Sequence, residues 1–178
     1  MSHRVALLGS INVGGNKLKM GDLKAALEKD GFAHVSTIVA SGNVLFEHPM
    51  DSNTTLEARI AEIVLTQFGI SSLAVVRTKA ELEQALEESP FAGKGEDKLV
   101  HVQFLKAQPA QTQFEALVKD HKGRGPEKLA PGTRALHIDY VSGVGSSKLT
   151  GAFIEKRLGC KGTARNVRSI QRIIEKFP

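Results

Sequence analysis

The feature that most constrains this chain is the order of strand-like and helix-like segments in its first 77 residues. Short apolar runs alternate with segments whose apolar residues recur at helical spacing, as Leu23, Ala26 and Leu27 do. The expected strands are residues 4–8, 35–40, 44–46 and 73–76, and the expected helices are residues 20–30 and 52–68. This order, β-α-β-β-α-β, is the split β-α-β pattern of an α+β fold.

The second half of the chain repeats most of this order. Thr78 and Glu81 fit a capping box that begins a helix ending near Pro90. We then expect strands at residues 99–105, 128–130 and 134–140, with a turn at Pro131-Gly132, and helices at residues 110–119, 147–158 and 163–176. The last helix, capped by Thr163, stands where the first half has a strand. We therefore predict two tandem subdomains, residues 1–77 and 98–178, joined by a helix and linker at residues 78–97.

This pattern predicts where two polar loops lie. In a split β-α-β unit the third strand lies antiparallel between the first two, so the first two strands end at the same edge of the sheet. The loop of residues 10–19 leaves the first strand, and the turn Ser41-Gly42-Asn43 leaves the second. We therefore expect these loops to converge, although they are far apart in the sequence.

The composition of the two loops is typical of an anion-binding site. Gly14 and Gly15 let successive backbone N–H groups point into one concavity, and the following helix N-terminus adds partial positive charge. Further donors or charges could come from Asn12, Asn16, Lys17, Ser41 and Asn43. The alternative is that the glycines only supply positive φ angles for a turn, while the lysines are solvated.

A second glycine-containing loop, from Gly143 to Lys148, also follows a strand and begins a helix. Its amides could hold an anion, together with Ser146, Ser147 and Lys148. Neither loop matches a known phosphate fingerprint. The first has Gly15 where a P-loop needs lysine, and the second has Lys148 where a dinucleotide-binding loop needs its third glycine.

The positive charge is concentrated near the C-terminus. Eight basic and two acidic residues between Lys148 and Pro178 leave a charge of +6 there, so the rest of the chain sums to −1 of the total +5. On the expected last helix, Arg165, Arg168 and Arg172 lie opposite an apolar face. This face could contact an anion or be solvated. Nucleic acid is one candidate partner. Against it, bases usually stack on aromatic side chains, and the chain has no Trp and a single Tyr.

Signals for catalysis are sparse. The six histidines show no metal-ligand spacing, so we assign no metal, no cofactor and no catalytic residue. The single Cys160 cannot form an internal disulfide, which favours a reducing compartment. We see no signal peptide and no apolar run long enough to span a membrane, and therefore expect a cytoplasmic protein.

Several strings occur together and in order along the chain: INVGGNKLKMGDLKAALEKDGF, ASGNVLF, SPF, GVGSSKLT and GTARNVRSI. In combination they resemble the bacterial domain-of-unknown-function 1697 family over nearly the whole chain. The resemblance implies two ferredoxin-like α+β subdomains and little about activity. Two positions depart from it, because members usually have Arg-Gly where Gly9-Ser10 stands and many have Trp at Val167. The family-type residues present are Asn12, Gly14, Gly15, Ser41, Gly42, Asn43, Lys148, Arg165 and Asn166.

Asn166 falls near the apolar sector of the expected last helix, so its side chain needs a partner. It could hold the start of the helix to a loop or contact a ligand. Three functions remain open: a module binding a phosphate-containing ligand, an enzyme acting on a small anion, and a non-catalytic homodimeric interaction protein. The candidate ligand-binding residues are Asn12, Gly14, Gly15, Asn16, Lys17, Ser41, Gly42, Asn43, Ser146, Ser147, Lys148, Arg165, Asn166 and Arg168.

Overall fold

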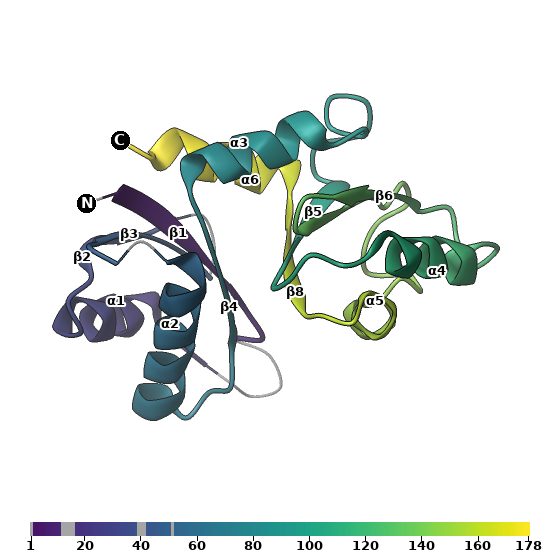
Figure 1. The fold of residues 1–178 in the computed structure, drawn as a ribbon. Helices are drawn as coiled ribbons and strands as arrows, with labels where there is room; N and C mark the ends of the chain where they lie inside the picture. The colour runs from purple at the N-terminus through teal and green to yellow at the C-terminus, as the bar shows by residue number, and fades with distance from the viewer. Residues whose placement is uncertain (1, 12–16, 39–41, 51) are drawn as a thin grey trace. The chain divides into compact units, whose positions relative to one another are not determined.

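The computed structural model describes residues 2–11, 17–38, 42–50 and 52–178 of the chain (Figure 1). The chain divides into two compact units, one of residues 1–82 with 172–178 and one of residues 83–171. Within the described part of the chain, no helix combines the length and apolar character needed to cross a bilayer.

The first unit contains a four-stranded antiparallel sheet with the strand order β2-β3-β1-β4. Its strands are β1 (Ser2–Gly9), β2 (Ala33–Thr37), β3 (Asn43–His48) and β4 (Leu73–Arg77), and its helices are α1 (Met20–Lys29) and α2 (Asn53–Phe68). The predicted β-α-β-β-α-β order is therefore confirmed, with β3 antiparallel between β1 and β2.

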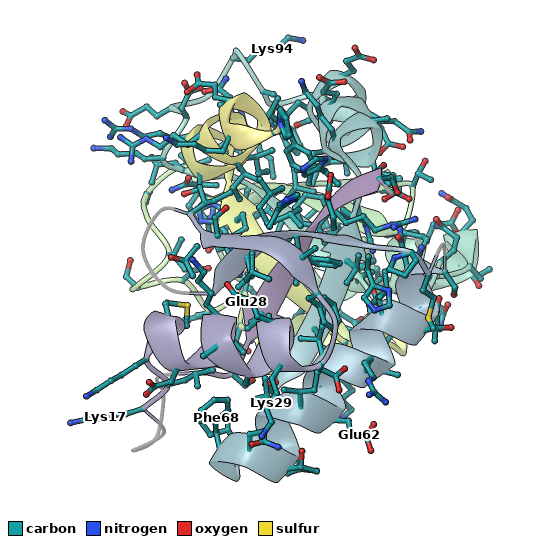
Figure 2. All side chains as sticks on the ribbon, turned by 90° about the vertical axis from the view of Figure 1, so that its left-hand side faces the viewer. Lys17, Glu28, Lys29, Glu62, Phe68 and Lys94 are labelled. Atoms are coloured by element: carbon teal, nitrogen blue, oxygen red, sulfur yellow. The ribbon has the colours of Figure 1, made fainter. Side chains whose placement is uncertain are left out.

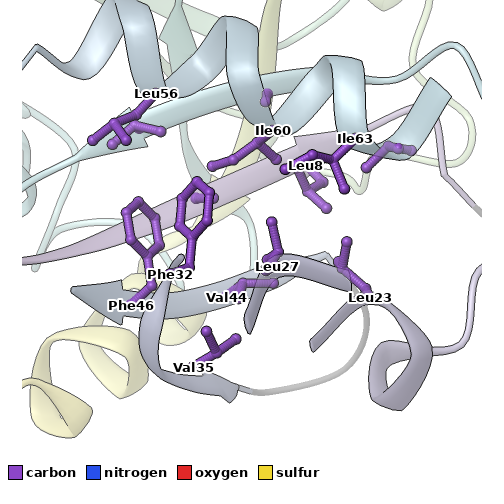
Figure 3. Packing of buried hydrophobic residues seen from close by; sticks show 14 of the residues in the cluster. Leu8, Leu23, Leu27, Phe32, Val35, Val44, Phe46, Leu56, Ile60 and Ile63 are labelled. Atoms are coloured by element: carbon purple, nitrogen blue, oxygen red, sulfur yellow. The ribbon is translucent and has the colours of Figure 1, made fainter. Parts of the chain in front are cut away.

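Helices α1 and α2 cover one face of this sheet and enclose an apolar core. The side chains that meet there include Leu23 and Leu27 from α1, Leu56 and Ile60 from α2, and Leu8, Val44 and Phe46 from the strands (Figure 3). Phe32 packs edge-on against Phe46, with ring centroids 5.0 Å apart. Burial of such side chains is the main favourable term in folding, at about 1.5–3 kcal/mol for each large one.

The helix ends of the first unit follow local signals in the sequence. The Ser52 hydroxyl accepts a hydrogen bond from the Thr55 N–H at 3.2 Å, and Gly69 ends α2 with a left-handed φ of 68°. The capping box at Thr78 and Glu81 is present at the start of α3 (Lys79–Glu88), because each side chain bonds the other residue's backbone N–H.

The second unit repeats the fold, with the strand order β6-β7-β5-β8. Its strands are β5 (Val100–Leu105), β6 (Lys128–Gly132), β7 (Ala135–Asp139) and β8 (Gly162–Asn166), and its helices include α4 (Gln111–His121) and α5 (Gly151–Leu158). The buried cluster beneath α4 and α5 includes Leu105, Leu136, Ile138, Phe114 and Ile154.

The prediction that Thr163 caps the last helix is wrong, because Gly162–Asn166 is strand β8. It pairs antiparallel with β5, placing Thr163 opposite Phe104 and Arg165 opposite Val102. The last helix, α6 (Val167–Lys176), begins only after this strand. The second half therefore completes the β-α-β-β-α-β order, and Arg165 does not share a helix face with Arg168.

Several other boundaries differ from the prediction, and two of them concern the loops of the second unit. The β6–β7 turn is at Thr133-Arg134, since Pro131 and Gly132 are still paired with β7. Helix α5 begins at Gly151 and not near Ser147, because the Thr150 hydroxyl accepts from the Phe153 N–H at 3.2 Å and so caps it.

Candidate functional site

The two polar loops of the first unit leave its sheet at the same edge. Leu7 is paired with Asn43, and the Leu8 N–H donates to the Gly42 carbonyl at 2.8 Å. The end of β1 is therefore in direct contact with the end of the β2–β3 turn, as the topology predicts. Asn12, Gly14, Gly15, Asn16 and Ser41 lie outside the described residues, so their part in a site stays a prediction.

The described ends of these loops are fixed by burial and by backbone conformation. Ile11 and Leu18 flank the first loop and are 8% and 5% exposed, within the core under α1 and α2. Both exits use positive φ angles, 60° at Ser10 and 92° at Gly42. The second value suits glycine, which has no Cβ to clash with the backbone.

Lys17 and Lys19 bring positive charge to this edge. Both side chains are exposed, and Lys17 extends away from the ribbon near α1 in Figure 2. Lys19 occupies the N-cap position of α1, where its side chain makes no capping hydrogen bond. The first turn of α1 therefore receives no cap from this residue, and its N–H groups add to the local positive potential.

Asn43 has a structural role in the turn. Its side chain is 3% exposed, and its Nδ2 donates to the Ile38 carbonyl at 3.2 Å. The amide thus ties the start of β3 to the end of the β2 segment. This hydrogen bond uses one of the donors that the sequence suggested for binding a ligand.

The second unit has the same edge, and its backbone geometry repeats that of the first. The Leu105 N–H donates to the Arg134 carbonyl at 2.9 Å, and Phe104 is paired with Ala135. Arg134 has a φ of 48°, so this turn also enters its strand through a left-handed residue. Leu8 therefore corresponds to Leu105, and Gly42 to Arg134.

In the second unit this edge holds a carboxylate. Oε1 of Glu88, at the end of α3, accepts from the Thr133 N–H at 2.8 Å and from the Thr133 hydroxyl at 2.7 Å. The next N–H of the turn, that of Arg134, donates to the Gln108 Oε1 at 2.6 Å. Burial raises the pKa of Glu88, but hydrogen bonds from Thr133 and His137 outweigh it and bring that pKa below its usual value. The turn thus binds an ionised carboxylate through backbone and hydroxyl donors.

His137 supports the same carboxylate from the sheet. Its ring is fully buried, its Nε2 lies 3.2 Å from Glu88 Oε2, and burial lowers its pKa. Because the carboxylate only accepts hydrogen bonds, the neutral ring carries its proton on Nε2. A Cβ on Gly132 would stand 2.6 Å from that nitrogen, so glycine makes room for the contact.

The loop of residues 143–148 also meets a carboxylate of the protein. The Ser147 hydroxyl donates to Glu127, whose other oxygen lies 3.5 Å from His121 Nε2. Burial raises the pKa of Glu127, but its hydrogen bonds from Ser147 and its own N–H, together with His121, bring it below the usual value. A serine nucleophile needs the histidine between itself and the acid. Here the acid lies between, so these residues do not form such a triad.

Of the ligand-binding residues predicted in the second unit, Arg165 and Asn166 form hydrogen bonds within the protein. The Arg165 guanidinium donates to the Thr163 hydroxyl at 2.8 Å and to the Ala164 carbonyl at 2.9 Å, and burial lowers its pKa to about 10. Asn166 Oδ1 accepts from the Ser169 N–H at 2.8 Å and so caps α6. Ser146, Lys148 and Arg168 are exposed.

Asn166 and the 143–148 loop lie at the same edge of the second sheet. His101 is paired with Asn166, and Val100 with Asp139, so β8 and β7 end at the same edge of the sheet, on either side of β5, and β7 leads into the 143–148 loop. This edge is opposite to the one at Thr133. The second unit therefore places Lys148 and Asn166 at an edge that does not correspond to the Gly42 edge of the first.

Sequence reasoning did not find the contacts of Glu88, Glu127 or His121. These contacts join residues 6 to 49 positions apart and follow no spacing rule, so no local pattern indicates them. Within the described part of the chain, no three His, Cys, Asp or Glu side chains are placed to hold a metal ion.

Comparison with known proteins identifies the fold and the family. The chain is similar to the solved structure of the conserved bacterial protein SP0830 from Streptococcus pneumoniae, with 20% identity and a TM-score of 0.70 over 98% of this chain and 97% of the other. At this identity the likeness shows the fold, two tandem ferredoxin-like subdomains. No curated protein matches the chain. A family model matches residues 1–137, and the chain therefore belongs to the family described as proteins of unknown function, DUF1697.

Proposed function

We propose that the first unit binds a small anionic, phosphate-containing ligand at the edge where β1 and the β2–β3 turn end. The observation that carries this proposal is the Glu88 carboxylate held by Thr133 at the corresponding edge of the second unit. The same backbone arrangement recurs at Leu8 and Gly42. In the first unit we assign the place of that carboxylate to an external anion.

The charge of the described residues around this edge supports the same ligand class. Lys17 and Lys19 are exposed beside the start of α1, and the N-terminus of a helix favours negative charge. Glycine-rich loops whose amides converge are a recurrent way to hold phosphate. By sequence, Asn12, Gly14, Gly15, Asn16 and Ser41 would supply the remaining donors.

The exposed basic residues of α6 offer a second, separate surface for a larger anion. Arg168, Arg172 and Lys176 are solvent-exposed, whereas Val167, Ile170 and Ile173 are buried. Such a stripe contacts phosphates without reading sequence, and the affinity of such contacts falls steeply with salt. Short single-stranded RNA therefore belongs among the ligands to be tested.

The test is an NMR titration of the full chain with inorganic phosphate, pyrophosphate, ribose 5-phosphate, AMP and a short oligouridylate. We expect saturable shifts of the Leu8, Gly9 and Gly42 amides with at least one of these ligands. Replacing both Lys17 and Lys19 by Gln should weaken binding roughly fivefold or more, since two favourable charges are lost. The matched control is Lys24→Gln, on α1 itself, which should leave the affinity unchanged. If none of these anions shifts the three amides, the proposal is wrong.

A further inference from the structure

A cavity of about 410 Å³ opens in the first unit at the other end of β3. Its lining includes Asp30 at the end of α1, His48 at the end of β3, Met50 beyond it, and Leu56, Arg59 and Glu62 of α2. Strand β3 runs from Asn43 to His48, so the end of the cavity at His48 is about 17 Å from the Gly42 edge at the usual rise per residue. It is therefore separate from the anion site proposed above.

The walls of the cavity are mainly apolar. Leu56 is fully buried at its base, while Met50 is 41% exposed and Ala58 adds a methyl group from the outer side of α2. The His48 ring packs against Phe32 in a tilted arrangement, with centroids 4.7 Å apart. This volume and lining suit the apolar body of a small molecule, such as a single aromatic ring.

The positive and negative charges of the described residues that line the cavity are not equal in number. Arg59 makes two hydrogen bonds of 2.6 Å to Asp30, which lower the pKa of Asp30 and raise that of Arg59, so these two charges neutralise each other. Glu62, exposed on α2 (Figure 2), has no salt bridge to any of the described residues. Among the described lining residues this leaves one net negative charge, on Glu62, which also attracts Arg59.

His48 adds a hydrogen-bond donor of known tautomer. The Met50 N–H donates to His48 Nδ1 at 3.1 Å, so Nδ1 is an acceptor and the neutral ring carries its proton on Nε2. The lining of the cavity therefore includes an imidazole that carries an N–H, as well as the Glu62 carboxylate. An anionic group would be repelled by Glu62, whereas an ammonium group would be attracted.

We infer that this cavity is a binding site for a small organic cation, with an apolar ring against Leu56 and Met50 and an amine near Glu62. The inference is independent of the anion site, because it uses no residue of the Gly42 edge. It assigns to the first unit two ligand sites of opposite charge preference at the two ends of β3.

The experiment is an NMR titration of the full chain with three probes of equal size: benzylamine, benzyl alcohol and benzoate. Benzylamine should give saturable shifts of the Met50, Ala58 and Glu62 amides with a millimolar Kd, as expected for a ligand of so few atoms. It should bind roughly three- to fivefold more tightly than benzyl alcohol, and benzoate should bind more weakly than either.

Two variants make the inference falsifiable. Glu62→Gln should remove the preference for benzylamine over benzyl alcohol, whereas the control Glu83→Gln, an exposed acid on α3, should preserve it. Ala58→Trp changes an exposed residue and fills the cavity, so it should abolish binding of all three probes. The inference fails if benzylamine gives no saturable shifts, if benzoate binds as tightly as benzylamine, or if binding persists in Ala58→Trp.

Discussion

At the end of β1 the Leu8 N–H donates to Gly42, and at the end of β5 the Leu105 N–H donates to Arg134. The two units therefore build the same backbone junction. The side chains around this junction differ. In the second unit, N–H groups of the β6–β7 turn donate to the side chains of Glu88 and Gln108. The corresponding turn of the first unit has lysines nearby and no acid in its sequence from Ser36 to Phe46.

The difference shows what a duplicated fold keeps and what it varies. The strand order and the junction persist, since both are fixed by backbone hydrogen bonds and by the handedness of the connections. The side chains at the edge can change without loss of the fold. One copy satisfies its turn donors with an acid of its own, and we propose that the other binds an external ligand there.

Removal of the internal acid should produce the largest effect. Glu88→Ala leaves the Thr133 donors and the buried His137 N–H without their acceptor, so we expect the free energy of unfolding to fall by about 2–4 kcal/mol. Urea denaturation followed by circular dichroism measures this change. Glu88→Gln keeps an acceptor oxygen and should cost about 1 kcal/mol.

The same variant tests the comparison directly. If the edge accepts external anions once its own acid is removed, acetate should stabilise Glu88→Ala more than chloride does at equal ionic strength. The native chain should show no such preference at this edge. Equal effects of the two salts on Glu88→Ala would count against the view that the edge is an anion site.

The second prediction exchanges a residue between the two units. Asn43 occupies the position that Ala135 occupies in the second unit, and its amide donates to the Ile38 carbonyl. Asn43→Ala should lower the free energy of unfolding by about 1–2 kcal/mol, because that carbonyl loses its donor. The exposed Ser36→Ala on β2 serves as the control, with an expected change under about 0.5 kcal/mol. A loss equal to that of the control would mean that the bond does not hold the turn.

Much of the fold follows from local signals in the sequence. Ser52, Gly69 and the Thr78–Glu81 box define helix ends through hydrogen bonds that span only a few residues. The apolar periodicity of α1 and α2 reflects their contact with a single sheet face. These features made the first unit predictable element by element.

Strand β8 could not be predicted in the same way. Its sequence, GTARN, has no alternation of apolar residues, and only Thr163 is buried. Its conformation is determined by pairing with β5, which lies far away in the sequence. Thr163 also resembles a helix cap, so the local signal favoured the wrong element.

Only the location of the candidate site could be predicted from the sequence. Topology brought the stems of two loops to one edge, which needs no knowledge of side chains. The contact of Glu88 with Thr133 joins residues 45 positions apart, and that of Ser147 with Glu127 joins residues 20 apart. Such pairs depend on tertiary packing, so no motif or spacing indicates them.

The third prediction concerns acid. Burial lowers the pKa of His137 and of His101, both in the second unit, so the unfolded chain binds protons at these positions more readily than the folded chain. Stability should therefore fall as the pH drops below about 6.5, by at most about 1.4 kcal/mol per pH unit for each histidine. The lowered pKa of Glu88 adds a loss of the same sign below about pH 4.5.

This loss should be local to the second unit. Leu45 stands in the first unit where His137 stands in the second, and it does not titrate. Hydrogen exchange between pH 6.5 and 5.5 should show β5 and β7 losing protection relative to β1 and β3. His137→Gln should reduce that difference. Equal loss of protection in both sheets would contradict the assignment to His137.

The smallest effects are expected at Gly42 and Arg134, the left-handed residues that directly precede β3 and β7. Gly42 has a φ of 92°, which an L side chain adopts only with strain, so Gly42→Ala should cost about 1 kcal/mol. Arg134 already tolerates a φ of 48°. In Arg134→Gly, relief of that strain is offset by greater freedom of the unfolded chain, so the net change should stay within about 0.5 kcal/mol. Thermal unfolding of the two variants side by side measures the contrast. If both cost the same, the two turns are under equal strain, and the glycine at position 42 needs an explanation other than its backbone angle.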